Sequence, residues 1–353
     1  MKKREVVVIT GASAGVGRAT VREFARRAAN NGVAIALIAR NPEALADAKR
    51  EVEQLGGEAL ALPLDISDAA AVEDAAARIE RELGPIDIWV NDAMESVFSP
   101  VKEMKAEEYH RVTNVTYLGY VYGTLAALKR MLPRDRGTIV QVGSALCYRS
   151  IPLQSAYCAA KHAIVGFTDS LRCELYHDNS NVHVTVVQMP ALNTPQFDWV
   201  RSRLPRHPQP VPPIFEPEVA ARAIYFAAHA RRRELWVGMP TVAAIIGQRL
   251  IPGLLDRYLG KTGYESQQTQ QPVSPTRQDN IQHYVPGDAG AHGDFDARST
   301  SRSWELEFAM KRNWILGAAA LAGISIAWAT RNRRNRDRSR SHAERDEPQA
   351  WVA

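Results

Sequence analysis

Short Val/Ile-rich runs alternate with helical patterns of ten residues or more over residues 5–240. Several runs are apolar at consecutive positions, as expected of strands that helices cover on both faces. Repeated strand–helix units of this kind predict a parallel sheet in an α/β fold. The expected strands are EVVVIT, VAIALIA, EALALPL, IDIWVN, GTIVQVG, NVHVTVVQM and ELWVG, and the expected helices include residues 16–29, 42–55, 69–83 and 156–177.

The pattern changes after about Tyr264, where the chain becomes polar and rich in Gln, Pro and Gly. Such a segment cannot build a core of its own, which predicts a polar linker or a surface strap over residues 261–310. The apolar segment 241–264 before it could cap a substrate cleft, rest on a membrane surface or simply pack. We therefore expect a catalytic domain over residues 1–260.

A second apolar run, WILGAAALAGISIAWAT, occupies residues 314–330 without a charge and has basic residues on both sides. As a helix it would span roughly 26 Å, against a hydrocarbon core of about 30 Å. Residues 311–331 are therefore a candidate membrane helix, and residues 332–353 a basic, disordered tail. A buried helix of the folded protein or of its oligomer is the alternative.

The net charge of +5 is concentrated at this end of the chain. Residues 301–353 contain ten Lys or Arg and six Asp or Glu, a net charge of +4, so the net charge does not indicate nucleic acid binding by the main domain, and we expect no nucleic acid partner. The three cysteines show no metal-ligand spacing, so we expect no metal and free thiols in a reducing, cytoplasmic compartment. The basic N-terminus leads into only four apolar residues, which predicts a first strand and no secretory signal.

VVVITGASAGVGRAT places a glycine-rich turn between the first strand and the first helix. Glycines at 11, 15 and 17 let the backbone turn sharply and approach a pyrophosphate, and the helix N-terminus offers N–H donors to the phosphates. A tight turn without a ligand is the alternative. In this position, directly after a strand, the motif predicts a dinucleotide site.

The end of the second strand bears on the choice of cofactor. Ala39 and Arg40 stand where an NAD site usually offers an acidic residue to the ribose 2′-OH. An Arg can bind a 2′-phosphate bidentately, which favours NADP(H) as the cofactor, with NAD(H) as the other possibility. The alternative without a functional role is that Arg40 is a solvated residue at the start of a helix. Asp65 could reach the adenine amine or cap the helix that starts near Ser67.

SAYCAAKHAIVGF, residues 155–167, carries Tyr157 and Lys161 four residues apart on an expected helix. Ser144 lies thirteen residues before Tyr157 at the end of an expected strand, and Asn114 lies thirty residues before Ser144. Together with TGASAGVG, this set resembles the short-chain dehydrogenase/reductase family over residues 4–240. The resemblance implies a Rossmann-like, doubly wound parallel sheet of about seven strands with a C-terminal extension.

The resemblance also assigns roles to these side chains. It implies that Tyr157 is the general acid/base, that Lys161 activates it, that Ser144 holds the carbonyl oxygen and that Asn114 holds a proton-relay water. Physical chemistry supports the first two roles, because a phenol with a reference pKa of about 10 needs nearby positive charge to work near neutral pH. The implied cofactor-binding residues are Gly11, Ser13, Gly15, Val16, Gly17, Arg40, Asp65, Asn91, Tyr157, Lys161, Pro190 and Thr194.

Two segments depart from the family pattern. NDAM, residues 91–94, replaces Asn-Asn-Ala-Gly, so Met94 should crowd the wall near the cofactor ribose and Asp92 adds a charge. QMPALNT keeps Pro190 and Thr194 but has Ala191 where Gly is usual. The following loop carries Phe197, Trp199 and Leu204, which either line an apolar substrate pocket or serve packing.

These features predict an NADP(H)-dependent oxidoreductase that interconverts a carbonyl and an alcohol, with a small molecule as substrate and a membrane tether favouring a lipophilic one. The alternative is a catalytically weak dinucleotide-binding membrane scaffold or redox sensor, which NDAM and the tail motivate. The catalytic domain is expected in the cytoplasm, attached to a membrane by the C-terminal helix. The resemblance further suggests a homodimer or homotetramer packed through the helices around residues 114–131 and 156–177.

Overall fold

The computed structural model describes residues 4–27, 32–274 and 276–312, together with residues 325, 328, 330 and 331. The chain divides into two compact units, Met1–Leu306 and Glu307–Ala353. No helix within the described ranges is long and apolar enough to cross a bilayer. The apolar run at 314–330 lies almost entirely outside those ranges, so its assignment as a membrane helix stays a prediction.

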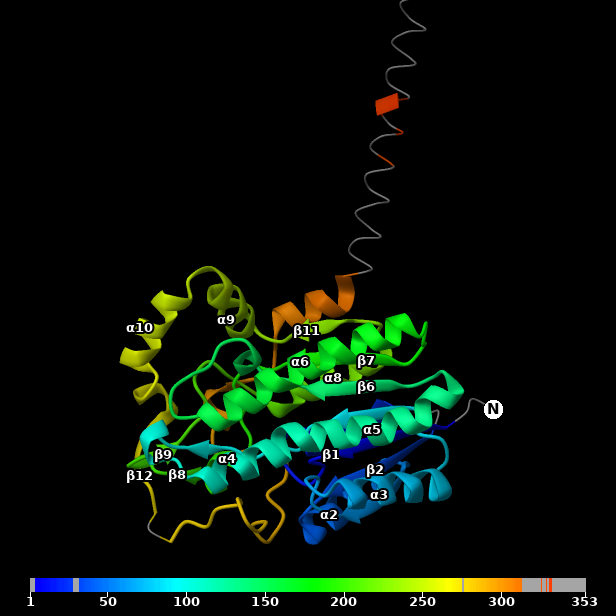
Figure 1. Ribbon diagram of the computed structural model, residues 1–353, viewed down its shortest axis with the longest axis horizontal. Coiled ribbons are helices and arrows are strands. Elements are labelled where there is room, and N and C mark those ends of the chain that lie inside the picture. The colour runs from blue at the N-terminus through cyan, green and yellow to red at the C-terminus, as the bar shows by residue number, and fades with distance from the viewer. Residues whose placement is uncertain are drawn as a thin grey trace, which may run out of the picture. The chain divides into compact units, whose positions relative to one another are not determined.

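Seven parallel strands form the central sheet of the first unit, as the alternating pattern predicts (Figure 1). Their order is β11-β7-β6-β4-β1-β2-β3, so β2 and β3 lie on one side of β1, and β4 and the later strands lie on the other side, with the strand order reversing between β1 and β4. Each expected strand is present within two residues at either end. The strands are β1 Glu5–Thr10, β2 Val33–Ala39, β3 Glu58–Pro63, β4 Ile88–Asn91, β6 Thr138–Val142, β7 His183–Gln188 and β11 Glu234–Trp236.

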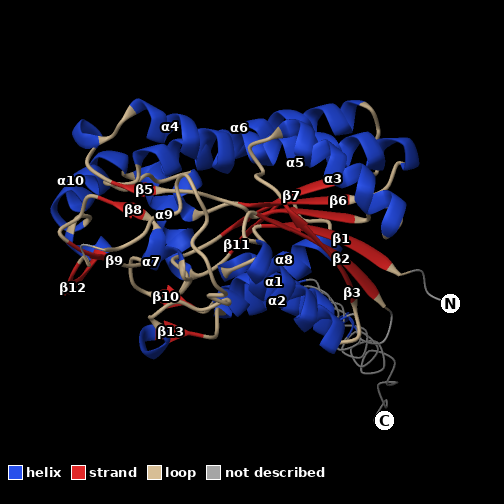
Figure 2. Ribbon diagram, turned by 90° about the horizontal axis from the view of Figure 1, so that it is seen from below, coloured by secondary structure: helices blue, strands red, loops and turns tan. Residues whose placement is uncertain are grey.

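Helices cover both faces of this sheet, which gives the doubly wound fold (Figure 2). On one face lie α3 Ala69–Glu82, α4 Ala106–Thr113, α5 Gly119–Met131 and α6 Ser155–His177. On the other lie α1 Gly15–Arg27, α2 Pro42–Gln54 and α8 Pro217–His229. Between the layers the strand residues are almost fully buried, which is why the strands are apolar at successive positions.

Smaller elements gather at the carboxyl ends of the strands, around the loops that follow β4 and β7. They include the short helices α7 Gln196–Trp199, α9 Met239–Leu250 and α10 Pro252–Thr262. Three two-stranded pairs tie these loops together: β5 Val97–Phe98 with β8 Arg201–Ser202, β9 Arg206–Pro208 with β12 Gln268–Pro272, and β10 Ile214–Phe215 with β13 Ser299–Thr300. The segment predicted as linker or strap is therefore part of the first compact unit up to Leu306.

Candidate functional site

A cavity of about 450 Å³ opens at the carboxyl ends of the central strands, next to the β1/β4 reversal. In open α/β sheets this is where ligands bind, because loops from neighbouring strands diverge there. The lining combines the glycine-rich loop after β1, the ends of β2 and β3, the NDAM segment after β4, and the loops after β6 and β7. Most of the predicted site residues therefore meet in one place.

The glycine-rich loop has the geometry that a dinucleotide site needs. Gly11 and Gly15 have φ angles of 73° and 57°, in the left-handed region that favours glycine. A Cβ on Gly17 would lie 2.1 Å from the carbonyl oxygen of Gly11, so only glycine lets α1 pack this closely under the loop. Gly11, Ser13, Gly15 and Val16 line the cavity, whereas Gly17 lies beneath it. These residues fit a bound pyrophosphate at the N-terminus of α1.

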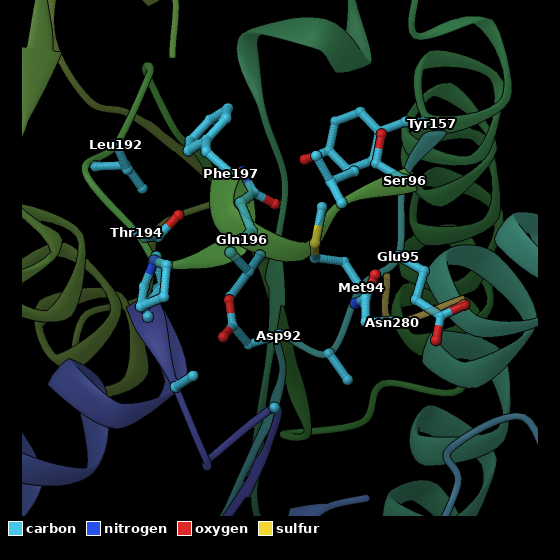
Figure 3. A pocket seen from close by; sticks show the side chains of 18 of the residues that line it. Asp92, Met94, Glu95, Ser96, Tyr157, Leu192, Thr194, Gln196, Phe197 and Asn280 are labelled. Atoms are coloured by element: carbon cyan, nitrogen blue, oxygen red, sulfur yellow. The ribbon is translucent and has the colours of Figure 1, made fainter. Parts of the chain in front are cut away.

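Tyr157 projects from α6 towards the centre of the cavity (Figure 3). Ser144 also lines the cavity, at the end of β6. Burial raises the pKa of the Tyr157 phenol well above its ordinary value, and the Ser144 side chain opposes this shift only in part. The phenol is therefore neutral at physiological pH and carries a proton that it can donate.

Lys161 lies one helical turn after Tyr157 and is 2% exposed. Its Nζ donates to the carbonyl oxygen of Val142 at 2.6 Å and to the Tyr120 hydroxyl at 3.0 Å, and lies 5.6 Å from the centre of the Tyr157 ring. Burial lowers the pKa of the Lys161 ammonium to about 8, which leaves it charged at neutral pH. Sequence reasoning did not find Tyr120, because a tyrosine inside an apolar helix gives no signal by itself.

Asn114 lies outside the residues that line the cavity. It begins a five-residue π-helical turn, Asn114–Leu118, and its Nδ2 lies 3.2 Å from His110 Nδ1 in an exposed contact. The buried residue of this turn next to the NDAM loop is Thr116, whose Oγ1 donates to the carbonyl oxygen of Glu95 and accepts from Glu95 N. Asn114 is therefore not among the residues that line the cavity with Tyr157, and its role as holder of a relay water stays a prediction.

The side chain of Asn91, which the resemblance implies is a cofactor-binding residue, lies in the core. Asn91 is fully buried at the end of β4 and does not line the cavity. Its Oδ1 accepts from Trp89 Nε1 at 2.8 Å, and its Nδ2 donates to Gln141 Oε1 at 2.9 Å. The Asn91 carboxamide thus joins β4 to β6 inside the protein, and its role in cofactor binding stays a prediction.

Arg40 and Asp65 both line the cavity, but each already has partners. Arg40 forms an ion pair with the buried Glu95 at 2.8 Å, and Arg111 bridges Glu95 at 2.9 Å and Asp65 at 2.7 Å. Asp65 Oδ1 accepts from Ser67 N, while Asp68 caps α3, so Asp65 is not the helix cap. Nη1 of Arg40 is buried without a hydrogen-bond partner among the described residues, which leaves one donor for a ligand such as a phosphate.

The NDAM segment brings a carboxylate into the cavity beside Lys161. Asp92 accepts a hydrogen bond from the backbone N–H of Gly17, and burial raises the pKa of its carboxyl to about 7, although Lys161 and Gly17 oppose the shift. Met94 lines the same wall with its side chain towards the cavity (Figure 3). Both departures from the family pattern therefore face the space where a cofactor would bind.

The loop after β7 supplies the remaining predicted residues. Pro190 and Thr194 line the cavity, and Thr194 packs so closely that a Cβ on Gly15 would lie 3.3 Å from its side chain. Phe197 and Trp199 line it too, whereas Leu204 is buried beside Phe197. The apolar lining on this side comprises Phe98, Leu192, Phe197, Trp199, Val200, Val211 and, from α9, Pro240 and Ala244.

Three comparisons relate this site to known proteins. The short chain dehydrogenase family profile matches residues 5–204. An uncharacterized oxidoreductase, YxnA, of Bacillus subtilis (strain 168) is 34% identical over 333 residues, which cover 94% of this chain and 91% of the relative. A fatty acyl-CoA reductase of Acinetobacter baylyi is 29% identical over 245 residues, 69% of this chain and 79% of that protein.

Among solved structures, the chain is similar to an alcohol dehydrogenase from the archaeon Thermococcus sibiricus, complexed with 5-hydroxy-NADP. The two share 25% of their residues with a TM-score of 0.56, over 67% of this chain and 96% of the other. The likeness to a structure complexed with an NADP derivative supports nicotinamide dinucleotide binding by this fold.

Proposed function

We propose that this chain, which belongs to the short chain dehydrogenase family, interconverts a lipophilic carbonyl compound and its alcohol with NADP(H), with Tyr157 as the proton donor and acceptor. The convergence of Tyr157, Ser144 and Lys161 on the cavity that holds the glycine-rich loop carries this proposal. A bound nicotinamide would supply the hydride to the carbonyl carbon or remove it from the alcohol.

The protein's own side chains would handle the proton. In the reducing direction the neutral Tyr157 hydroxyl donates its proton to the carbonyl oxygen, and the Ser144 hydroxyl holds that oxygen. The charged Lys161 ammonium, 5.6 Å from the Tyr157 ring centre, stabilises the phenolate that remains. In the oxidising direction the phenolate accepts the alcohol proton. The hydrogen bonds from Lys161 to Val142 and Tyr120 keep the ammonium in place.

Arg40 supports NADP(H) as the cofactor, because its free Nη1 donor and its charge suit a 2′-phosphate. The apolar residues around Phe197 and Trp199 support a lipophilic substrate, and the likeness to a fatty acyl-CoA reductase favours long-chain carbonyl compounds. The alternative of a weak scaffold or sensor is not favoured, because it would leave the buried Tyr157–Ser144–Lys161 arrangement without a use.

The experiment is NADPH consumption by the purified chain with a panel of short- and long-chain aldehydes and ketones, run in parallel with NADH. Tyr157→Phe should lower kcat by about 10³-fold and change the NADPH dissociation constant less than about twofold, because only the proton transfer is lost. Tyr122→Phe, on α5, is the matched control and should keep full turnover. Turnover of Tyr157→Phe within tenfold of the wild type would contradict the assignment.

A further inference from the structure

The last part of the first unit returns to the cavity from the far end of the chain. Residues 276–298, here called the strap, run along the edge of the molecule towards α2 in yellow and orange (Figure 1). The strap residues that line the cavity are Asn280, Tyr284, Val285, Pro286, Gly287 and Ala289. They share this cavity with the ends of β2 and β3, more than 200 residues earlier in the sequence.

Backbone carbonyls hold the strap to the loops after β1 and β2. Asn41 Nδ2 donates to the carbonyl oxygens of Val285 at 3.0 Å and Gly287 at 2.9 Å. Arg40 Nη2 donates to the carbonyl oxygen of Asn280 at 2.7 Å. These two loops are the ones that carry the predicted cofactor-binding residues, so the strap is positioned by the cofactor site itself.

Further contacts fix both ends of the lining stretch. At one end, Ile281 is 1% exposed, packs with Val97 and Val112, and its carbonyl oxygen accepts from Arg111 Nε at 3.0 Å. At the other end, Gly290 accepts from the backbone N–H of Gly15 at 3.0 Å. Asp288 pairs with Arg18, a residue 1% exposed, at 3.1 Å. The stretch in between is therefore held against the site by its backbone, with its side chains left available to a ligand.

The side chains in this stretch suit a purine ring better than a phosphate. Tyr284, Val285 and Pro286 offer an aromatic and an aliphatic surface without positive charge, and an aromatic ring can stack on a nucleobase. Dinucleotides place their adenosine half beside the loop after the second strand. Asn280 lines the cavity, and its Oδ1 is a buried acceptor with no hydrogen-bond partner in the described part of the chain. The exocyclic amine of adenine is a donor of the kind that such an acceptor would bind.

We propose that the strap forms the outer wall of the adenosine half of the cofactor site, with the Tyr284 ring against the base. This inference rests on the proposed function, because it presupposes a dinucleotide in the cavity. It assigns a binding role to residues outside the matched range of 5–204. It also implies that the cofactor is enclosed between two distant parts of the chain, so that its release requires the strap to move.

The test measures binding of adenosine 2′,5′-bisphosphate by calorimetry and release of NADPH by stopped-flow fluorescence on the full chain. Tyr284→Ala should weaken the bisphosphate about tenfold and speed NADPH release by a similar factor. Tyr284→Phe keeps the ring and should behave as the wild type. His283→Ala is the matched control, because His283 is an exposed neighbour that does not line the cavity.

Three outcomes of these measurements would overturn the binding role of the Tyr284 ring or the proposed function on which it rests. If Tyr284→Ala binds the bisphosphate as tightly as the wild type does, the strap is a passive cover and the inference is overturned. If His283→Ala weakens binding as much as Tyr284→Ala, the loss reflects disturbance of the whole strap and the assignment to the Tyr284 ring is overturned. If the wild-type chain binds no bisphosphate, the NADP(H) assignment fails, and the function proposed with that cofactor falls with it.

Discussion

Asp92 and Lys161 show how single side chains set the electrostatics of this cavity. Burial disfavours the charged form of each group. It therefore raises the pKa of the Asp92 carboxyl to about 7 and lowers the pKa of the Lys161 ammonium to about 8. Asp92 replaces the neutral residue of the family pattern and lies against Gly17, under the loop that would hold the pyrophosphate. Its ionisation should therefore oppose cofactor binding.

NADPH binding should depend on pH through the ionisation of the Asp92 carboxyl. Asp92 is protonated below pH 7 and ionised above it, so the NADPH dissociation constant of the wild type should rise as the pH increases from 6 to 8. Asp92→Asn should bind NADPH roughly tenfold more tightly at pH 8 and show a flatter profile, because the carboxamide still accepts from Gly17 but carries no charge. Fluorescence titration at several pH values measures both effects.

Asp65→Asn is the control for this prediction. Asp65 lines the same cavity, but its bonds to Arg111 and Ser67 lower the pKa of its carboxyl, so it stays ionised over the whole range. Its substitution should leave the slope of the pH profile unchanged. An Asp92→Asn profile as steep as that of the wild type would show that another group, such as Lys161, controls the pH dependence.

At the scale of elements, the join between the glycine-rich loop and α1 tolerates the least change. Gly17→Ala would place a Cβ 2.1 Å from the carbonyl oxygen of Gly11, which the backbone can relieve only by moving the loop off the helix. We expect about 1–3 kcal/mol lower stability and loss of measurable NADPH binding. Thermal denaturation with and without NADPH measures both.

Gly166→Ala, in the middle of α6, is the matched control for that substitution. A Cβ there meets nothing within 4 Å, and alanine favours a helix over glycine. The Gly166 variant should keep its cofactor affinity and be at least as stable as the wild type. Equal behaviour of the two variants would mean that close packing under the loop is unimportant.

The presence of a helix at Asn114 could be predicted from the sequence, but the rotation of that helix about its axis could not. The resemblance to the short-chain dehydrogenase/reductase family implied that Asn114 would join the site, and the helix is indeed present at this position. A helical residue turns by about 100° from its neighbour, so Asn114 and Thr116 lie on nearly opposite sides. The π-helical turn sets the rotation of the helix here, and it buries Thr116 against Glu95 while Asn114 faces His110.

At the scale of the whole molecule, the boundary of the catalytic unit lies later than the predicted residue 260. Phe295 from the strap packs edge-on against Phe197 with ring centres 5.9 Å apart, and Leu306 is fully buried. β13 pairs with β10, so residues up to about 306 contribute to the same fold as the sheet. The linker of the sequence pattern is thus a structural part of the unit that holds the cavity.

Two truncations test this boundary. A chain that ends after Arg312 should keep the turnover and unfolding midpoint of the full chain, because the first compact unit is complete. A chain that ends after Ser274 should lose at least about 5 °C of its midpoint and most of its NADPH affinity, because it loses Phe295, Leu306 and the strap. Calorimetry measures the midpoints; unchanged behaviour of the shorter chain would show that the strap is dispensable.

Membrane fractionation of the chain that ends after Arg312, against the full chain, tests the attachment predicted for residues 311–331. Loss of the membrane-bound fraction on truncation would support it, and recovery of both chains in the soluble fraction would refute it.

The sequence by itself determined the sheet, the glycine-rich loop and the pair of Tyr157 and Lys161, because each depends on residues close together in the chain. Apolar runs, a positive φ at Gly11 and a spacing of four on one helix are local properties. Only the tertiary structure decided that the Asn91 side chain is hydrogen-bonded in the core and that Tyr120 accepts a hydrogen bond from Lys161. The same holds for the hydrogen bonds between the strap and Arg40 and Asn41. Those contacts join residues 41 to 244 positions apart, and their formation depends on how helices rotate and loops pack, which no local pattern encodes.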